Sequence, residues 1–168
     1  MYVNFIFIAI FLGYSIGSAP IISFHYGAKN NCELKNLFKK SLSLIGSWGI
    51  MLFIIAQIIS GPLAKLFVGY NAELFVMTKH GFQIFCFAFL INGFNIFGSS
   101  FFTALNNGLI SAAISFLRTL VFQLSVVLIL PMILGINGIW ISVAIAELLT
   151  LCVTVTCLIR KRKVYHYI

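Results

Sequence analysis

The chain has 168 residues, of which 61% are hydrophobic and 8% are charged, and its mean hydropathy is +1.09. A composition this apolar excludes an ordinary water-soluble domain. The formal net charge is +8, but the basic residues stand in short clusters at the ends of apolar runs, which argues against nucleic-acid binding.

Five apolar runs predict an all-α, polytopic integral membrane bundle, because about twenty helical residues cross the hydrocarbon core of a bilayer. Proline cannot continue a helix without losing a hydrogen bond, so we expect Pro62 to stop the second run and Pro131 to stop the fourth. Residues 62–80 are amphipathic and predict a short helix at the membrane surface. The predicted transmembrane helices cover residues 3–24, 41–60, 81–105, 109–130 and 138–159, and a basic tail follows at 160–168.

The distribution of lysine and arginine predicts the orientation. The first loop and the tail together carry eight of these residues, whereas the opposite side carries only Lys65 and Lys79. Cytoplasmic loops are enriched in Lys and Arg, so we expect a cell-membrane protein whose C-terminus is cytoplasmic. With five helices and a cytoplasmic C-terminus, we expect Met1 on the outer side, although no signal peptide precedes the first helix. This arrangement is typical of the second part of a longer or split carrier.

A line of polar side chains runs along the third predicted helix, on one face at 3.6 residues per turn. A buried amide without a partner costs roughly 2–7 kcal/mol, so the line must face a helix bundle or a wet cavity. Polar residues also hold membrane helices together, and both interpretations stay open here. The line consists of Asn92, Asn95, Ser99, Thr103 and Asn106.

Two charged residues lie inside predicted membrane helices. Arg118 and Glu147 are each roughly 13 Å from the nearer end of their helix at 1.5 Å per residue, and they approach from opposite faces. This depth predicts an ion pair between neighbouring antiparallel helices. Alternatively, Arg118 extends to the surface, and Glu147 is protonated or capped by Ser142 or Thr150. Ionisable residues inside a membrane are candidates for a substrate or ion pathway.

Several motifs carry a resemblance to a known family. They are GYSIGSAPIISFHYGAKNNCE (13–33), SSFFTALNNGLISAAISFLR (99–118), LPMILGINGIW (130–140) and AIAELL (144–149). In this order and with these loop lengths, the chain resembles the multidrug and toxic compound extrusion (MATE) transporters over nearly its whole length.

The resemblance implies twelve helices in two six-helix lobes, of which this chain would supply about helices eight to twelve. It implies alternating-access antiport, in which H⁺ or Na⁺ moves inward and a small cationic or amphipathic drug moves out. The implied partners are a missing N-terminal lobe, in the same chain or a separate subunit, and membrane lipid. No other cofactor or metal is expected. Candidate pathway residues are Asn92, Asn95, Ser99, Arg118 and Glu147.

The chain also departs from the family pattern. Some relatives carry coupling acids on the helix that corresponds to the third one here, where this chain has Asn92 and Asn95. His25 stands where relatives often carry asparagine. These differences leave the coupling ion open.

Other functions compete with drug export. A lipid or lipid-linked saccharide flippase of the same superfamily would need a cationic cavity for a pyrophosphate headgroup, towards which Arg118 contributes one charge. The G-x-S-x-G pattern at 13–17 suggests an intramembrane Ser-His protease as an alternative. The serine would need a histidine base at its own depth, but His25 and His80 do not lie at the depth of Ser15. A non-transporting membrane scaffold is the remaining alternative. We expect a transporter and not an enzyme.

Overall fold

The computed structural model describes residues 2–167, and side chains from residue 4 onwards, and within that range every regular element is a helix. Seven α-helices are joined by short turns and by two irregular helical segments, η1 and η2. The elements are α1 (Tyr2–Gly27), α2 (Asn31–Val68), α3 (Ala72–Phe85), η1 (Cys86–Ala88), α4 (Phe89–Ala104), α5 (Gly108–Phe116), η2 (Leu117–Gln123), α6 (Leu124–Leu134) and α7 (Ile136–Tyr165).

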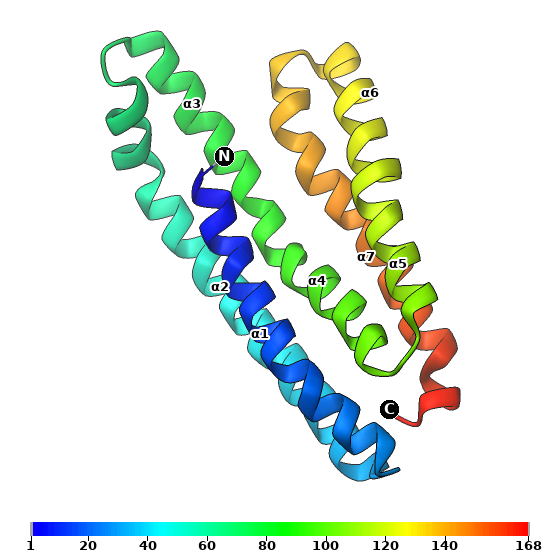
Figure 1. The fold of residues 1–168 in the computed structure, drawn as a ribbon. Helices are drawn as coiled ribbons and strands as arrows, with labels where there is room; N and C mark the ends of the chain where they lie inside the picture. Colours follow the sequence, from blue (N-terminus) through cyan, green and yellow to red (C-terminus); the bar gives the residue numbers. More distant parts are fainter. Residues whose placement is uncertain (1, 168) are drawn as a thin grey trace.

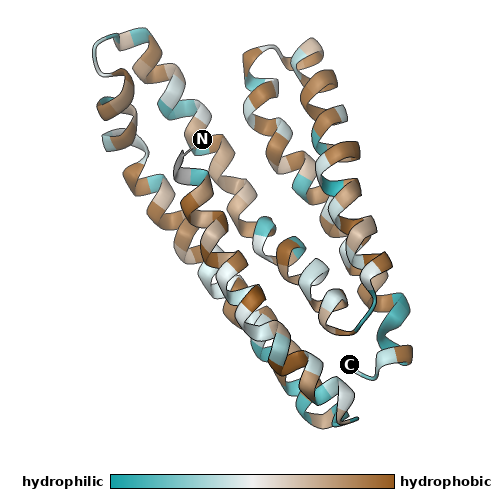
Figure 2. Cartoon of the chain, in the orientation of Figure 1, coloured by the Kyte–Doolittle hydropathy of each residue, from teal (hydrophilic) through white to brown (hydrophobic). Residues whose placement is uncertain are grey.

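The helices form five rods that are long and apolar enough to cross a membrane, which confirms the predicted number of spans. Two rods are α1 and α2, and a third, α7, closes the chain. The remaining two are composite, because α3, η1 and α4 continue as one rod, and α5, η2 and α6 as another. Figure 1 shows the rods lying side by side, and Figure 2 shows hydrophobic residues along most of their length.

The prediction of a helix break at Pro62 is wrong. Helix α2 passes through Pro62 and ends at Val68, so residues 62–80 do not form a separate surface helix. A proline costs the helix one hydrogen bond, but Ser60 and Ala64 on either side of it are buried against the bundle, and this packing outweighs the loss. The chain turns where caps are available, since the side chain of Asn71 accepts hydrogen bonds from the first turn of α3.

Pro131 likewise lies inside α6 rather than at its end. The helix continues to Leu134 and stops at Gly135, whose φ of +58° lies in the region that favours glycine. The predicted end of the fourth helix at 130 is therefore four residues too early, because the turn chemistry and not the proline decides it.

Helix α4 is the central element, and it contacts α1, α2, α5 and α7. Four of its five phenylalanine rings are buried, and Phe101 lies 4.9 Å from the ring of Phe38 and Phe89 4.8 Å from that of Phe7. Gly98 permits close approach to α7, because a Cβ atom there would collide with the methyl group of Thr154. This packing holds the polar line of α4 against the last two rods.

The last two rods form a hairpin that stands beside the first three (Figure 1). Within the hairpin, α6 and η2 pack against α7. At the end remote from the C-terminus, α7 touches α3 through Trp140, whose indole covers Gly81 so closely that a Cβ atom would not fit.

The segment that follows α7 folds back onto the bundle as far as Tyr167, the last described residue. Helix α7 extends to Tyr165, beyond the predicted end at 159, and His166 (φ +54°) reverses the chain. Tyr167 is fully buried between the rings of Phe38 and Phe101, and its hydroxyl donates to the carbonyl of Leu158 at 2.7 Å. Burial raises the pKa of Tyr167, so the phenol stays neutral.

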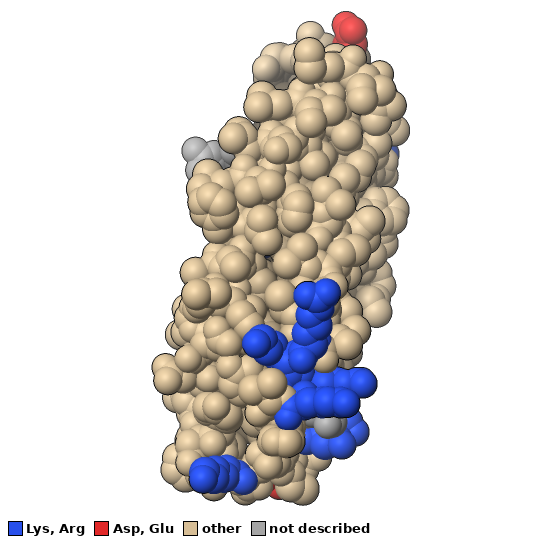
Figure 3. Space-filling view, turned by 90° about the vertical axis from the view of Figure 1, so that its right-hand side faces the viewer, with Lys and Arg blue, Asp and Glu red and all other residues tan. Residues whose placement is uncertain are grey.

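Basic residues gather at the end of the molecule where α7 ends, as Figure 3 shows. They come from the start of α2 and the turn before it, and from the end of α7. The eight residues are Lys29, Lys35, Lys39, Lys40, Arg160, Lys161, Arg162 and Lys163.

Candidate functional site: a buried charge network beside a cleft

The ion pair expected from the depths of Arg118 and Glu147 is present. Both Nε and Nη2 of the arginine donate to Oε1 of the glutamate, at 2.9 and 2.7 Å. The glutamate side chain is 4% exposed and the arginine side chain 22%. The pair therefore joins η2 to α7 in the middle of the hairpin, with its arginine on the more open side.

The two asparagines of α4 complete the network. Asn95 is buried, and its Nδ2 donates to Oε2 of Glu147 at 2.7 Å and to the backbone oxygen of Glu147 at 2.9 Å. Its own Oδ1 accepts from Thr154 at 3.2 Å. Asn92 Oδ1 accepts from Nη2 of Arg118. Each carboxylate oxygen thus receives at least one hydrogen bond, as a buried charge requires.

Two of the alternatives for these charges, the extension of Arg118 to the surface and the capping of Glu147 by hydroxyls of its own helix, do not occur. Arg118 does not extend to the surface, since its guanidinium group is bound to Glu147. Ser142 and Thr150 do not cap the carboxylate, because their hydroxyls donate to the carbonyls of Ile139 and Ala146 in their own helix. The charge is stabilised across helices rather than within one.

Arg118 lies in a π-helical segment, η2, which interrupts the rod formed by α5 and α6. A π-turn is wider than an α-turn, so it changes the direction of the side chains that follow it, and such turns are frequent at functional sites. Neither glycine nor proline marks the segment LRTLVFQ, so the sequence carried no local signal for it.

The rest of the polar line makes a second, separate cluster. Ser99 lies within 2.9 Å of the hydroxyls of Ser111 and Ser115, and Thr103 donates to Ser111 at 2.7 Å. These bonds join α4 to α5. For this part of the line, they agree with the interpretation that its polar residues hold membrane helices together. Asn106 is exposed in the turn after α4. The line is therefore not one continuous pathway lining.

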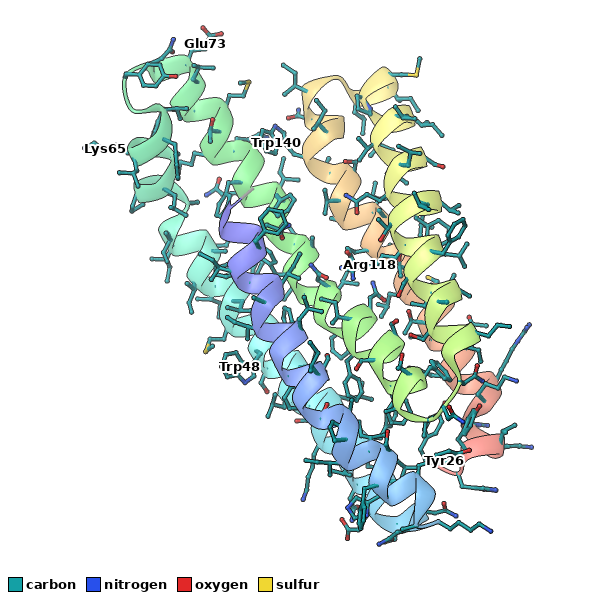
Figure 4. All side chains as sticks on the ribbon, in the orientation of Figure 1. Tyr26, Trp48, Lys65, Glu73, Arg118 and Trp140 are labelled. Carbon is teal, nitrogen blue, oxygen red and sulfur yellow. The ribbon has the colours of Figure 1, made fainter. Side chains whose placement is uncertain are left out.

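A cleft of about 880 Å³ opens beside the charge network. Asn92, Arg118 and Glu147 line it, together with Thr119 and Gln123 from η2. Asn95 supports the carboxylate without lining the cleft, and Ser99 does not line it either. Figure 4 places Arg118 between α4 and the hairpin, with Trp140 farther along the same gap.

Most of the cleft wall is apolar. Side chains of α1, α2, α3, α4 and α7 supply it, and several are aromatic. The aromatic members are Phe5, Phe67, Phe82, Phe85 and Trp140. The arrangement is a mainly hydrophobic cleft with one charged side, and Asn4, Ser60 and Thr78 add polar groups from α1, α2 and α3.

The sequence analysis missed several polar residues of this region, three of which belong to η2 and α7. Thr154 lies seven residues after Glu147, on the same helical face, and that spacing is a usable signal. Thr119 and Gln123 are four residues apart and also share a face. Their position beside Arg118 depends on the π-turn, which the sequence did not reveal.

The surroundings of Ser15 do not match the nucleophile elbow that the G-x-S-x-G pattern describes. The G-x-S-x-G pattern belongs to a strand-to-helix turn, but Ser15 lies inside α1. The hydroxyl is buried, and among the described residues it has no hydrogen-bond partner, histidine included. The geometry required for activating the serine is absent from this part of the chain.

Comparisons with known proteins agree with the fold. The MatE family model matches residues 1–130. The chain is similar to the solved MATE transporter VcmN of Vibrio cholerae in its bent form, with a TM-score of 0.79 and 19% identity. The match covers 94% of this chain and 37% of the VcmN chain. A search of curated proteins finds no match. Because the family model covers more than half of the sequence and the membrane-helix fold agrees with it, the chain belongs to the MATE family of transporters.

Proposed function

We propose that this chain is part of a cation-coupled antiporter that exports cationic or amphipathic drugs across the cell membrane. The observation that carries the proposal is the cleft bordered by the Arg118–Glu147 pair. Its volume falls in the range of about 300–1,000 Å³ that is usual for sites of drug-sized molecules.

The energetics of the pair support a functional role. Charged residues inside a membrane are costly to insert and usually mark a transport pathway. Here the charges lie in one network that borders a cleft, and not at a helix end where they could reach water. A hydrophobic pair would fill the same space without this cost, so we infer that the pair is kept for transport.

The architecture supports a two-lobe transporter. This chain spans 37% of the matched VcmN chain, which is consistent with about helices eight to twelve of twelve. We propose that a further lobe forms the opposite wall of the cleft, since substrate sites of many transporters lie between repeats. The eight basic residues at one end favour placing that end in the cytoplasm.

An efflux assay tests the proposal. The complete native gene product, with any sequence it carries beyond this chain, is expressed in efflux-deficient cells, and ethidium accumulation is followed. We expect cells with the protein to accumulate less ethidium than cells without it. Collapsing the gradient of the coupling ion, either the proton or the sodium gradient, should reverse this difference. Asn92→Leu should restore accumulation at an unchanged protein level. Thr156→Val serves as the matched control, because Thr156 is exposed on α7 and bonds only its own helix. Equal accumulation with and without the wild-type protein would refute export.

A lipid-linked saccharide flippase is the second candidate, favoured by the arginine beside the cleft. Among the described residues, however, Arg118 is the single basic side chain that lines the cleft, and a pyrophosphate would call for more positive charge. Translocation of a lipid-linked saccharide by reconstituted protein, without ethidium transport, would establish this candidate instead.

A further inference from the structure

We propose that a groove between α1 and α2 binds one acyl chain of an anionic phospholipid, such as phosphatidylglycerol, and that Lys39 and Lys40 hold the phosphate of this lipid. The groove shares no lining residue with the cleft beside Arg118, so its occupancy can be tested independently of drug export.

The size and lining of the groove suit an acyl chain. Its volume is about 230 Å³, which is below the range of about 300–1,000 Å³ that is usual for sites of drug-sized molecules. Apart from one phenol hydroxyl and one indole nitrogen, its side chains are hydrocarbon. A single flexible chain therefore fits better than a ring system. The lining residues are Ile10, Phe11, Tyr14, Leu44, Ile45 and Trp48.

Contacts within the bundle hold the groove in shape. Phe11 and Ile45 are buried, and both pack so closely on Gly93 of α4 that a Cβ atom there would overlap them. At the rim, the hydroxyl of Tyr14 donates to that of Ser41 at 2.8 Å, which joins α1 to α2. A chain can thus bind without separating the two helices.

The groove opens towards the bilayer. Leu44 and Trp48 are 40% and 39% exposed, and they lie on α2, which is long and apolar enough to cross the membrane. Figure 4 shows Trp48 on the side of α2 remote from the hairpin that contains α6 and α7. An acyl chain can therefore enter sideways from the lipid phase.

Two lysines stand where the groove meets the basic end of the molecule. Lys40 lies one helical turn before Leu44 on the same face of α2, about 6 Å along the helix axis, and Lys39 is its neighbour. Both lysines are exposed. The one salt bridge among residues 4–167 joins Arg118 to Glu147, so neither ammonium group has a carboxylate partner in this part of the chain.

The surroundings of the lysines favour an anionic headgroup. Phe38 packs against Tyr167, which places the lysines at the level where α7 ends and where basic residues meet lipid headgroups. Eight Lys and Arg residues gather at this end, against one acid, Glu33, which lies two turns before Lys40 and farther from the groove. Phosphatidylcholine would bring its own cation into this cluster, whereas phosphatidylglycerol brings only the phosphate charge.

Quenching of Trp48 by brominated acyl chains tests the site. The complete native gene product is placed in phosphatidylcholine nanodiscs, into which dibrominated phosphatidylglycerol or dibrominated phosphatidylcholine is titrated. The difference between the wild-type protein and Trp48→Phe isolates the signal of this tryptophan. We expect phosphatidylglycerol to bind about 5- to 30-fold more tightly than phosphatidylcholine, as one to two lysines near a phosphate predict.

Variants assign the preference to the two lysines. Lys39→Gln combined with Lys40→Gln should bring the two lipids to similar affinity, and the fold should tolerate it because both side chains are exposed. Arg162→Gln combined with Lys163→Gln is the matched control. It removes the same charge from two exposed residues at the same end, but on α7 and outside the groove, so the preference should remain.

Three results would overturn the inference. Equal quenching by the two lipids in the wild-type protein would show that the groove does not select an anionic headgroup. An equal loss of preference in the two double variants would assign the attraction to the whole basic end. Absence of Trp48 quenching by either lipid would show that protein, and not lipid, covers the groove.

Discussion

Asn95 binds both the side chain and the backbone of Glu147. Its amide nitrogen donates to the carboxylate at 2.7 Å and to the backbone oxygen of the same residue at 2.9 Å. The two residues belong to different rods, α4 and α7, and both are buried. This contact fixes the register of α7 on α4 and thereby the position at which Arg118 meets the carboxylate.

Removing one charge of the pair should be far worse than removing both. Arg118→Gln leaves a buried carboxylate without its counter-ion, which we expect to lower the free energy of unfolding by about 3–5 kcal/mol. The added change Glu147→Gln should recover most of this loss. Thermal unfolding in detergent measures both variants. A double variant no more stable than Arg118→Gln alone would show that the pair does not act as a unit, and the exchange of both charges, Arg118→Glu with Glu147→Arg, provides an independent check.

Replacing Asn95 by leucine should destabilise the bundle. The change removes the donor to Glu147 Oε2 and the acceptor of Thr154, leaving buried polar atoms unpaired at about 1–3 kcal/mol each. Thr154→Val should cost less, since it removes one hydrogen bond of 3.2 Å and leaves a single buried atom, Asn95 Oδ1, without that partner. Comparing the midpoints of thermal unfolding decides the point. Equal midpoints for Asn95→Leu and wild type would mean that the carboxylate finds another partner.

A methyl group at Gly81 should push α7 away from α3. The new Cβ atom would overlap the indole of Trp140, and overpacking of this kind costs about 1–3 kcal/mol. Trp140→Leu should relieve most of the strain of Gly81→Ala in a double-mutant cycle. Gly13→Ala is the control, because a Cβ atom there would have no described neighbour within 4 Å apart from the adjoining residues and backbone of its own helix, and alanine favours the helix. A melting temperature for Gly81→Ala equal to that of Gly13→Ala would contradict the close contact.

Tyr167 should contribute strongly to the stability of the basic end of the molecule. Tyr167→Ala removes a buried ring from contact with Phe38 and Phe101, and large-to-small changes of aromatic residues cost about 3–5 kcal/mol. Tyr167→Phe loses only the hydrogen bond to Leu158, at about 0.5–1.5 kcal/mol. Limited proteolysis at the C-terminal end measures the difference. Similar cleavage rates for Tyr167→Ala and wild type would place the ring outside the core.

Some features of this protein are determined by local sequence. Five membrane-length helices follow from hydropathy, because each rod must satisfy its own backbone hydrogen bonds in hydrocarbon. The pairing of Arg118 with Glu147 followed from depth along two antiparallel helices, since a charge at that depth needs a partner. These inferences need only distances along a helix.

Only the tertiary structure decided the rest. Pro62 predicts a helix end, yet α2 continues because the packing of Ser60 and Ala64 against the bundle outweighs one missing hydrogen bond. The hydrogen bond from Thr154 to Asn95, the burial of Tyr167 and the cleft each join residues that are distant in the chain. Hydropathy measures whether each side chain prefers water or an apolar environment, whereas these contacts depend on how the rods pack against one another. That packing is a property of the whole bundle, and it places Arg118 at the edge of the cleft.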